Sequence, residues 1–365
     1  MIKVGIECES LEDDTYGIAR LVGKLLEEIA RRPELEKEFA FTLYFKSKIP
    51  ALSYLDAPIF KKRVIGIPSF SLYYYVLLPM RLWFDRPDVM YYTNYMLPIL
   101  HRGKSLVFSA HDAYYEARSQ DISLRYRMAY RIFCTWAAKH ATKLMAMSEF
   151  GKQELATVYG ISPDRIVVNH LGVDVPHMAS VNRHGEYILF VGQAFSRRHL
   201  VETMQAFEKI TPDFPTMRLI IVGPDKYRPS RIQQLQADIN SRLGKERVIC
   251  FEHVSDSELA NLYAHAHALV YVSSREAFGL PPMEALVYGT VPVIADNALG
   301  HELFGNHAFF VRAPYTADAI AAALGAALTD TQKHAAIRSA ARSFSDRFNW
   351  PAHTDRFLEL VRALV

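Results

Sequence analysis

The stretch that decides the fold is Ala268-Leu-Val-Tyr-Val-Ser-Ser-Arg-Glu276-Ala-Phe-Gly-Leu-Pro-Pro-Met-Glu284-Ala-Leu-Val-Tyr-Gly-Thr-Val-Pro-Val-Ile-Ala295. It opens with an apolar run of strand length and reaches a pair of prolines where a helix can begin, a position that suits proline. A second apolar run of strand length closes it. Strands that are apolar throughout, separated by a helix, are typical of a parallel sheet covered by helices on both faces.

The same alternation extends along the chain. Strands are predicted at residues 2–8, 39–45, 88–93, 105–111, 143–148 and 165–170, and again at 187–192, 218–223, 247–252, 268–273 and 291–295. A length of 365 residues favours two domains. We therefore predict an α/β protein with two tandem Rossmann-like, doubly wound domains facing a cleft. The expected domains are 1–175 and 186–345, joined by a linker at 176–185, and a C-terminal helix at 346–365 could cap either domain.

The composition excludes several classes of protein. Lys and Arg exceed Asp and Glu by only 42 to 39, which does not favour a general nucleic-acid binder. Three widely spaced cysteines predict neither a zinc site nor a disulfide framework and favour a reducing, cytoplasmic compartment. The sequence opens on a predicted strand, so we expect no signal peptide. The dinucleotide motif G-x-G-x-x-G and the hydrolase motif G-x-S-x-G are missing, which disfavours dehydrogenases and α/β-hydrolases.

The loop after residues 268–273 carries the most informative polar groups. Glu276 lies in this loop, and Glu284 lies in the first turn of the helix that follows. The backbone amides around Phe278, Gly279 and Leu280 can hold a phosphate at the helix N-terminus. Carboxylates beside such an anion site suit the recognition of hydroxyl groups. Taken singly, each glutamate could instead be solvated or complement the helix dipole.

The two glutamates form an E-x7-E segment, and this segment resembles that of the family-four retaining glycosyltransferases with the GT-B fold (glycosyl transferases group 1). Other segments that resemble the family are Gly5-Ile-Glu with Tyr16-Gly17-Ile-Ala-Arg20, His111-Asp112, Met147-Ser148-Glu149-Phe150, Phe190-Val-Gly192 and Arg197-Arg198. Their order and spacing cover nearly the whole chain. The family usually has Lys where this chain has Arg198, which changes the contact geometry but keeps the charge.

The resemblance implies a role for each matching residue. Glu276 binds hydroxyls of the donor sugar, Glu284 binds the ribose, and Arg197 and Arg198 hold the diphosphate. Gly17 lets backbone amides approach the diphosphate, and His111 lies near the reacting centre. The catalytic residues implied are His111, Glu276 and Arg198, and the donor-binding residues are Gly17, Arg197, Arg198, Glu276, Ala277, Phe278, Gly279, Leu280 and Glu284.

The activity implied is transfer, with retention, of a hexosyl group from a UDP- or GDP-sugar. The acceptor is a saccharide or a lipid-linked saccharide, in cell-surface glycan or polysaccharide synthesis. No DxD-type aspartate pair occurs in a donor loop, so we expect no metal, and no cofactor besides the nucleotide sugar as co-substrate. The alternative is a catalytically inactive partner or scaffold that binds a nucleotide sugar. A GT-B epimerase or phosphorylase fits the residues less well.

A basic segment follows in the first half of the chain. Its cations are Arg118, Arg125, Arg127, Arg131, Lys139 and Lys143, and Asp121 is nearly its only acid. This segment could hold the protein peripherally on the anionic inner face of a membrane. We expect instead a solvated helix face, with Met128, Ile132, Phe133 and Trp136 turned into the core, and we likewise expect the aromatic segment 73–84 to be core.

Overall fold

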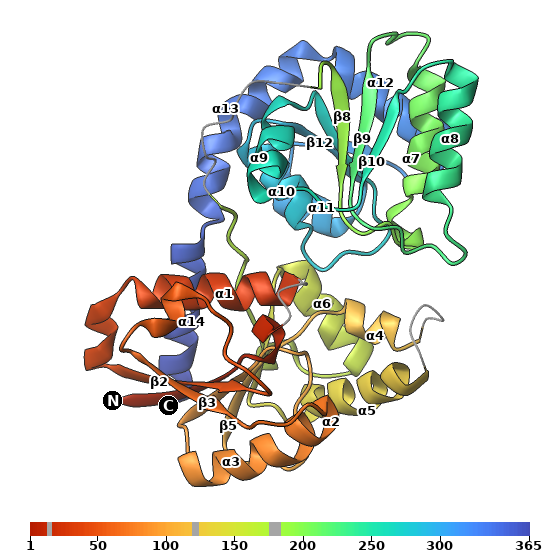
Figure 1. The fold of residues 1–365 in the computed structure, drawn as a ribbon. Coiled ribbons are helices and arrows are strands. Elements are labelled where there is room, and N and C mark those ends of the chain that lie inside the picture. The colour runs from red at the N-terminus through yellow and green to blue at the C-terminus, as the bar shows by residue number, and fades with distance from the viewer. Residues whose placement is uncertain (13–16, 119–123, 175–183) are drawn as a thin grey trace. The chain divides into compact units, whose positions relative to one another are not determined.

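The computed structural model describes residues 1–12, 17–118, 124–174 and 184–365. The chain forms two compact units, residues 1–172 with 350–365, and residues 173–349 (Figure 1). Each unit contains one sheet whose strands all pair in parallel. The predicted α/β class with two doubly wound domains is therefore confirmed. The predicted linker at 176–185 lies outside the described residues except for His184 and Gly185.

The sheet of the first unit has seven strands in the order β3-β2-β1-β4-β5-β6-β7. Its strands are β1 (Ile2–Glu7), β2 (Phe39–Phe45), β3 (Phe60–Val64), β4 (Val89–Tyr92), β5 (Lys104–Phe108), β6 (Lys143–Ala146) and β7 (Ile166–Val168). The direction of winding reverses between β1 and β4. At such a switch point, open α/β sheets leave a crevice beyond the carboxyl ends of the strands.

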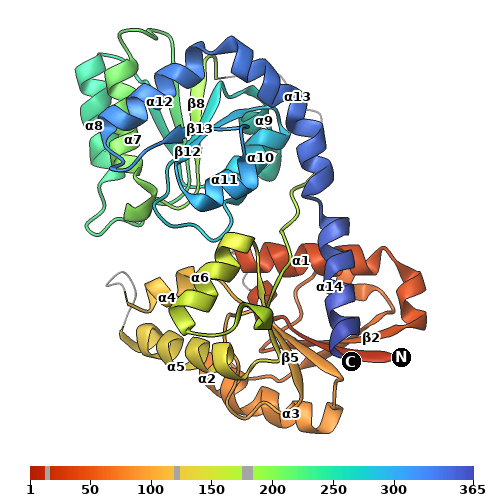
Figure 2. The same cartoon turned by 180° about the vertical axis from the view of Figure 1, so that it is seen from behind.

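Helices cover both faces of this sheet. The connection from β1 to β2 moves toward one edge of the sheet, whereas those from β3 to β4, β5 to β6 and β6 to β7 move toward the other edge. Because such crossovers are right-handed, α1 lies on one face of the sheet and the later helices lie on the other face. The C-terminal helix α14 packs against α1, as Figures 1 and 2 show. The helices of the first unit are α1 (Gly17–Ala30), α2 (Phe70–Leu72), the π-helical turn η4 (Tyr73–Leu77), α3 (Leu78–Asp85), α4 (Asp112–Glu116), α5 (Leu124–His140), α6 (Glu149–Tyr159) and α14 (Trp350–Leu364).

Two expectations about the core of the first unit are wrong. On α5, Met128 and Ile132 are 54% and 51% exposed. The small side chains of Cys134, Ala137 and Ala138 are buried instead, and at 100° per residue they lie on the opposite side of the helix from the first two. Phe133 and Trp136 are half-buried. In the aromatic segment, Tyr73 and Tyr74 are fully buried, as expected, but Phe84 is 79% exposed.

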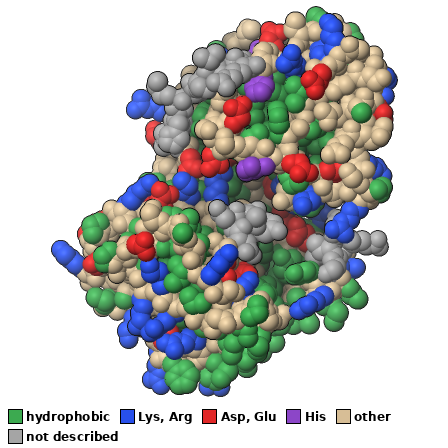
Figure 3. Space-filling view, in the orientation of Figure 1, with side chains coloured by type: hydrophobic (Ala, Val, Ile, Leu, Met, Phe, Trp, Pro, Cys, Tyr) green, Lys and Arg blue, Asp and Glu red, His purple; other side chains and the backbone are tan. Residues whose placement is uncertain are grey.

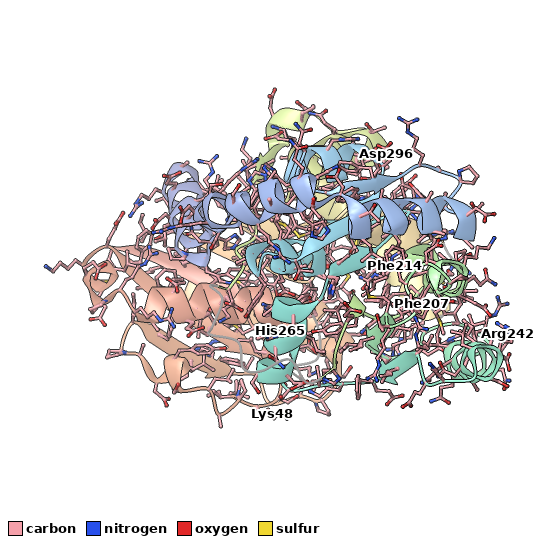
Figure 4. All side chains as sticks on the ribbon, turned by 90° about the horizontal axis from the view of Figure 1, so that it is seen from above. Lys48, Phe207, Phe214, Arg242, His265 and Asp296 are labelled. Atoms are coloured by element: carbon pink, nitrogen blue, oxygen red, sulfur yellow. The ribbon has the colours of Figure 1, made fainter. Side chains whose placement is uncertain are left out.

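The sheet of the second unit has six strands in the order β10-β9-β8-β11-β12-β13. They are β8 (Tyr187–Val191), β9 (Arg218–Val222), β10 (Val248–Phe251), β11 (Ala268–Tyr271), β12 (Val291–Ala295) and β13 (Phe309–Val311). The helices are α7 (Leu200–Ile210), α8 (Ile232–Leu243), α9 (Asp256–His265), α10 (Leu280–Val287), α11 (Ala298–Phe304), α12 (Ala317–Thr329) and α13 (Thr331–Arg347). Figure 4 shows Arg242 on the outer side of α8 and Phe207 further in, where it is fully buried.

Short 3-10 turns complete the described chain: η1 (Glu9–Glu12), η2 (Pro33–Lys37), η3 (Ser53–Asp56), η5 (Pro163–Arg165) and η6 (Ser196–Arg198). Within the described residues, no helix combines the length and the apolar character that crossing a bilayer requires.

Candidate functional site

The predicted residues of the second unit gather where β8 and β11 end. These strands pair in parallel, with Ile188 beside Ala268, so their carboxyl ends meet at one edge of the sheet. The winding also reverses here, because β9 and β10 lie on one side and β12 and β13 on the other. Ligands of open α/β sheets bind at such a switch point. Residues 192–199 follow β8 here, and residues 272–279 follow β11.

The Glu276 carboxylate is held from one side. Its Oε2 accepts a hydrogen bond of 2.8 Å from the hydroxyl of Tyr271. The same oxygen accepts from Nε and Nη2 of Arg198 at 3.4 and 3.3 Å. Among the described residues, no donor hydrogen-bonds the other oxygen, Oε1, and the side chain is 16% exposed. The protein therefore orients Glu276 through Oε2, and Oε1 can accept a hydrogen bond from a hydroxyl group of a ligand.

Arg198 is fixed in turn by the loop after β8 and by Tyr271 on β11. Its Nη1 donates to the carbonyl of Gln193 at 3.0 Å, and its guanidinium lies 5.1 Å from the ring of Tyr271. Gly192 leaves room for this side chain, since a Cβ there would lie 2.8 Å from Nη1 of Arg198. Gly192 also has φ +134°, a conformation that L side chains rarely adopt. Glycine at the end of Phe190-Val-Gly192 thus allows the guanidinium of Arg198 to lie against the backbone.

Arg197 links the two loops. Its carbonyl accepts hydrogen bonds from the backbone N–H of Ser274 at 2.8 Å and from the hydroxyl of Ser274 at 3.2 Å. Its guanidinium packs over the ring of Phe195 at 4.4 Å. Arg198 is paired with the Glu276 carboxylate, and Arg197 places a second guanidinium at the same edge of the sheet.

Glu284 lies one turn into α10 and is 8% exposed. Its Oε2 accepts a hydrogen bond of 2.7 Å from the hydroxyl of Tyr263 on α9. The helix begins after Gly279, which has φ +86°, so this residue turns the chain from the loop into the helix. Phe278 is buried, and Ala277 and Leu280 are half-buried on either side of it. Residues 277–280 therefore connect the loop that carries Glu276 to the helix that carries Glu284.

The two predicted residues of the first unit lie at its own carboxyl edge. His111 is buried at the start of α4, with Nε2 3.4 Å from Oδ1 of Asp112 and its ring edge-on to Phe150. Gly17 is the first residue of α1. Among the described residues, a Cβ at Gly17 would meet nothing within 4 Å, so packing does not require glycine there. The predicted roles of both residues stay predictions.

Sequence reasoning missed the side chains that hold the two glutamates, Tyr271 and Tyr263. Tyr271 lies within a predicted apolar strand, and no motif marks Tyr263. Sequence reasoning also gave no role of its own to Glu7, the last residue of the matching segment Gly5-Ile-Glu, which is fully buried at the end of β1. The Glu7 carboxylate accepts from the N–H of Glu9 at 2.8 Å, from Thr93 at 2.6 Å and from Asn94 at 2.9 Å. Burial raises the pKa of Glu7 to about 7. A charged residue that directly ends a buried strand is the signal that could have revealed it.

Two family models together match most of the chain. The family model described as Glycosyltransferase Family 4 matches residues 24–176, and the one described as Glycosyl transferases group 1 matches residues 179–344. The O-antigen chain mannosyltransferase RfbU of Salmonella typhimurium is 25% identical over 238 residues, which are 65% of this chain and 64% of that protein. The D-inositol 3-phosphate glycosyltransferase of Jonesia denitrificans is 26% identical over 235 residues, which are 58% of this chain and 54% of that protein.

The match thus spans less than two thirds of the length of either relative. Among solved structures, Anabaena Alr3699/HepE in complex with UDP-glucose superposes with a TM-score of 0.74 at 16% identity, covering 100% of both chains. At this identity the likeness concerns the fold.

Proposed function

The chain belongs to the GT-B glycosyltransferases that these two family models describe, and on this premise we propose that it transfers a hexosyl group, with retention, from a UDP- or GDP-sugar to a saccharide or lipid-linked acceptor. The observation that carries the proposal is the hydrogen-bonded set of Tyr271, Glu276 and Arg198 at the switch point of the second unit. The likeness to an O-antigen chain mannosyltransferase supports a role in the synthesis of a cell-surface glycan.

In the proposed mechanism, Glu276 positions the donor sugar through Oε1, which accepts hydrogen bonds from sugar hydroxyls. Arg197 and the backbone amides of residues 277–280 face the diphosphate. The bond between the anomeric carbon and the phosphate oxygen breaks, and the acceptor oxygen bonds to the same face of that carbon. The departing phosphate oxygen takes the proton of the acceptor hydroxyl. Arg197 stabilises the negative charge that develops on the diphosphate, so the rate depends on positioning and electrostatics.

The geometry disfavours Glu276 as a covalent nucleophile. The hydroxyl of Tyr271 and the guanidinium of Arg198 both donate to its Oε2, and each donor stabilises the carboxylate charge that a nucleophile has to share with the sugar. We therefore assign Glu276 to donor positioning. A double displacement through this residue is not part of the proposal.

We assign Glu284 to the ribose of the nucleotide. Tyr263 fixes its carboxylate through one short hydrogen bond, and a fixed carboxylate can accept from two neighbouring hydroxyls. Burial makes this interaction selective, because a ligand without these hydroxyls leaves a desolvated acceptor unsatisfied.

The proposal is tested by the release of free nucleoside diphosphate. The protein is incubated with UDP-glucose or GDP-mannose, together with disaccharide and lipid-linked saccharide acceptors. We expect Glu276→Gln to lower the release rate at least about 100-fold, because the amide nitrogen cannot accept a hydrogen bond. Glu246→Gln, which changes an exposed residue, serves as the matched control and keeps the wild-type rate.

The alternative, an inactive nucleotide-sugar-binding scaffold, gives a different result. It predicts that the wild type binds a nucleotide sugar but releases no nucleoside diphosphate with any acceptor. Release at the wild-type rate by Glu276→Gln contradicts the role assigned to this residue.

A further inference from the structure

Exposed apolar side chains are concentrated on one part of the first unit. Fourteen large apolar side chains of the described residues are exposed, and none of them lies in the second unit. Ten belong to three neighbouring segments: Leu72, Met80, Trp83 and Phe84 on α2 and α3, Ile99 and Leu100 between β4 and β5, and Leu124, Tyr126, Met128 and Ile132 on α5. We call these ten residues the apolar surface. Single exposed apolar residues are common, whereas a group of this size marks an interaction site.

The three segments pack against one another. The indole N–H of Trp83 donates to the carbonyl of Leu100 at 3.2 Å, which joins α3 to the segment after β4. The rings of Tyr75 and Phe133 stack at 3.7 Å, so the helical turn before α3 packs against α5. Figure 3 shows hydrophobic side chains gathered along the lower side of the first unit, where Figure 1 shows α3 and α5.

Helix α5 turns its large apolar side chains toward solvent and its small ones toward the core. Leu124, Met128 and Ile132 recur every fourth residue and form an exposed stripe. The 17 residues of this helix include four Lys or Arg and no Asp or Glu. A helix that presents an apolar stripe and cations to solvent resembles helices that lie in a membrane interface.

The surroundings of the apolar surface are cationic. The guanidinium of Arg102 lies 5.0 Å over the ring of Trp83, and Arg125 donates to the hydroxyl of Ser71 on α2. Among the described residues, no carboxylate lies within ion-pair distance of Arg102, Arg125 or Arg131. Residues 97–104 and 124–140 together contain six Lys and Arg and no Asp or Glu, although the whole chain has a net charge of only +3.

We propose that the apolar surface docks the first unit peripherally on an anionic lipid bilayer. Phe84, Leu124 and Met128 enter the interface, and the arginines around them reach the lipid headgroups while their methylene stems cover apolar area. Trp83 and Tyr126 suit the headgroup level, where amphipathic rings concentrate. The charge pattern favours a bilayer with anionic lipid over a neutral surface. This inference does not depend on the proposed transfer reaction. If both hold, the protein works where a lipid-linked acceptor resides.

The test is co-sedimentation of the full chain with phosphatidylcholine vesicles that contain either no anionic lipid or one third phosphatidylglycerol. We expect binding to the anionic vesicles at low salt and a steep decrease at 0.5 M salt, because salt screens exposed charges. The variant Arg102→Gln/Arg125→Gln/Arg131→Gln should bind about 100-fold more weakly, since each cation near an anionic surface contributes about a factor of 5. Phe84→Ser/Met128→Ser should bind at least about tenfold more weakly, since each loses buried apolar area.

Matched controls change the same number of exposed residues elsewhere. Lys245→Gln/Arg338→Gln/Arg342→Gln removes three exposed cations of the second unit, and Ile49→Ser/Val64→Ser removes two exposed apolar side chains outside the apolar surface. Both controls should bind like the wild type. Thermal melting shows that every variant is folded, independently of any vesicle and of the proposed transfer reaction.

Three results overturn the proposal. The first is no sedimentation with anionic vesicles at low salt, and the second is equal binding by the arginine variant and its control. The third is that Phe84→Ser/Met128→Ser converts a dimer to a monomer while vesicles bind neither form, which identifies a second copy of the chain as the occupant of the surface.

Discussion

Replacing Tyr271 with Phe isolates one hydrogen bond in the proposed donor site. The hydroxyl of Tyr271 donates to Oε2 of Glu276 at 2.8 Å. Burial and the Glu276 carboxylate raise the pKa of Tyr271 well above its ordinary value, so the hydroxyl stays a donor at any pH used for an assay. The ring is buried, stacks with Phe190 and contacts Arg198. Phe keeps these contacts, and only the hydroxyl is lost.

The expected effect follows from the partners that remain. A hydrogen bond to a charged group contributes about 1.5–3 kcal/mol. Arg198 still donates to the same oxygen, through contacts of 3.3 and 3.4 Å that are longer than the one removed. We therefore expect the lower end of the range, about 1.5 kcal/mol, which corresponds to about a tenfold lower kcat/KM for the nucleotide sugar. The loss should fall mainly on the step that requires a positioned sugar.

The assay is steady-state release of nucleoside diphosphate, with thermal unfolding measured in parallel. Tyr187→Phe is the matched control. Tyr187 lies on the neighbouring strand, is similarly buried, and donates to the carbonyl of Leu262 at 2.9 Å instead of to a carboxylate. Both variants should lose about 1 kcal/mol of stability, but only Tyr271→Phe should lose activity. Equal kcat/KM for the two variants refutes the positioning of Glu276 by Tyr271.

Three further outcomes are expected. Tyr263→Phe should weaken nucleotide binding about tenfold in calorimetric titration, because Glu284 loses the donor that orients it; unchanged affinity contradicts this role. The free energy of unfolding should fall by up to about 3 kcal/mol as pH rises from about 5 to 8. In the folded state Glu7 keeps its proton up to its raised pKa of about 7. In the unfolded state the same carboxyl group releases its proton near the ordinary pKa of a glutamate. Glu7→Gln, followed by chemical denaturation, should show a weaker pH dependence, and an equal slope argues against burial of the charge. Turnover with and without EDTA should agree, and a strict requirement for magnesium or manganese overturns the proposed metal independence.

Every interior strand of both sheets could be predicted from the sequence, and so could two of the four edge strands, β7 and β10. The predicted central strands correspond to apolar runs that are covered on both faces, which is the strongest signal a strand can have. The missed strands, β3 and β13, are both edge strands. β3 carries three consecutive basic residues, Lys61, Lys62 and Arg63, and β13 has only three residues. An edge strand is partly solvated and tolerates such a pattern.

The residues of the candidate site could likewise be predicted only in part. Glu276 and Glu284 stand out because carboxylates are unusual at the ends of apolar segments. Tyr263 and Tyr271, which hold them, resemble ordinary core aromatics, and only the three-dimensional pairing distinguishes a tyrosine that packs from one that also donates. The orientation of α5 is a similar case. Its sequence has large apolar residues on one side and small ones on the other. The small residues Ala137 and Ala138 face the core because they allow the helix to approach the sheet closely.

The central claim is that a nucleotide sugar binds at the carboxyl edge of β8 and β11. Calorimetric titration of UDP-glucose and GDP-mannose into the wild type, Arg197→Gln and the exposed-site control Arg342→Gln tests it directly. The account predicts that at least one of the two sugars binds the wild type and the control equally, and binds Arg197→Gln about 10- to 100-fold more weakly. Binding of neither sugar to the wild type, or undiminished affinity in Arg197→Gln, contradicts it.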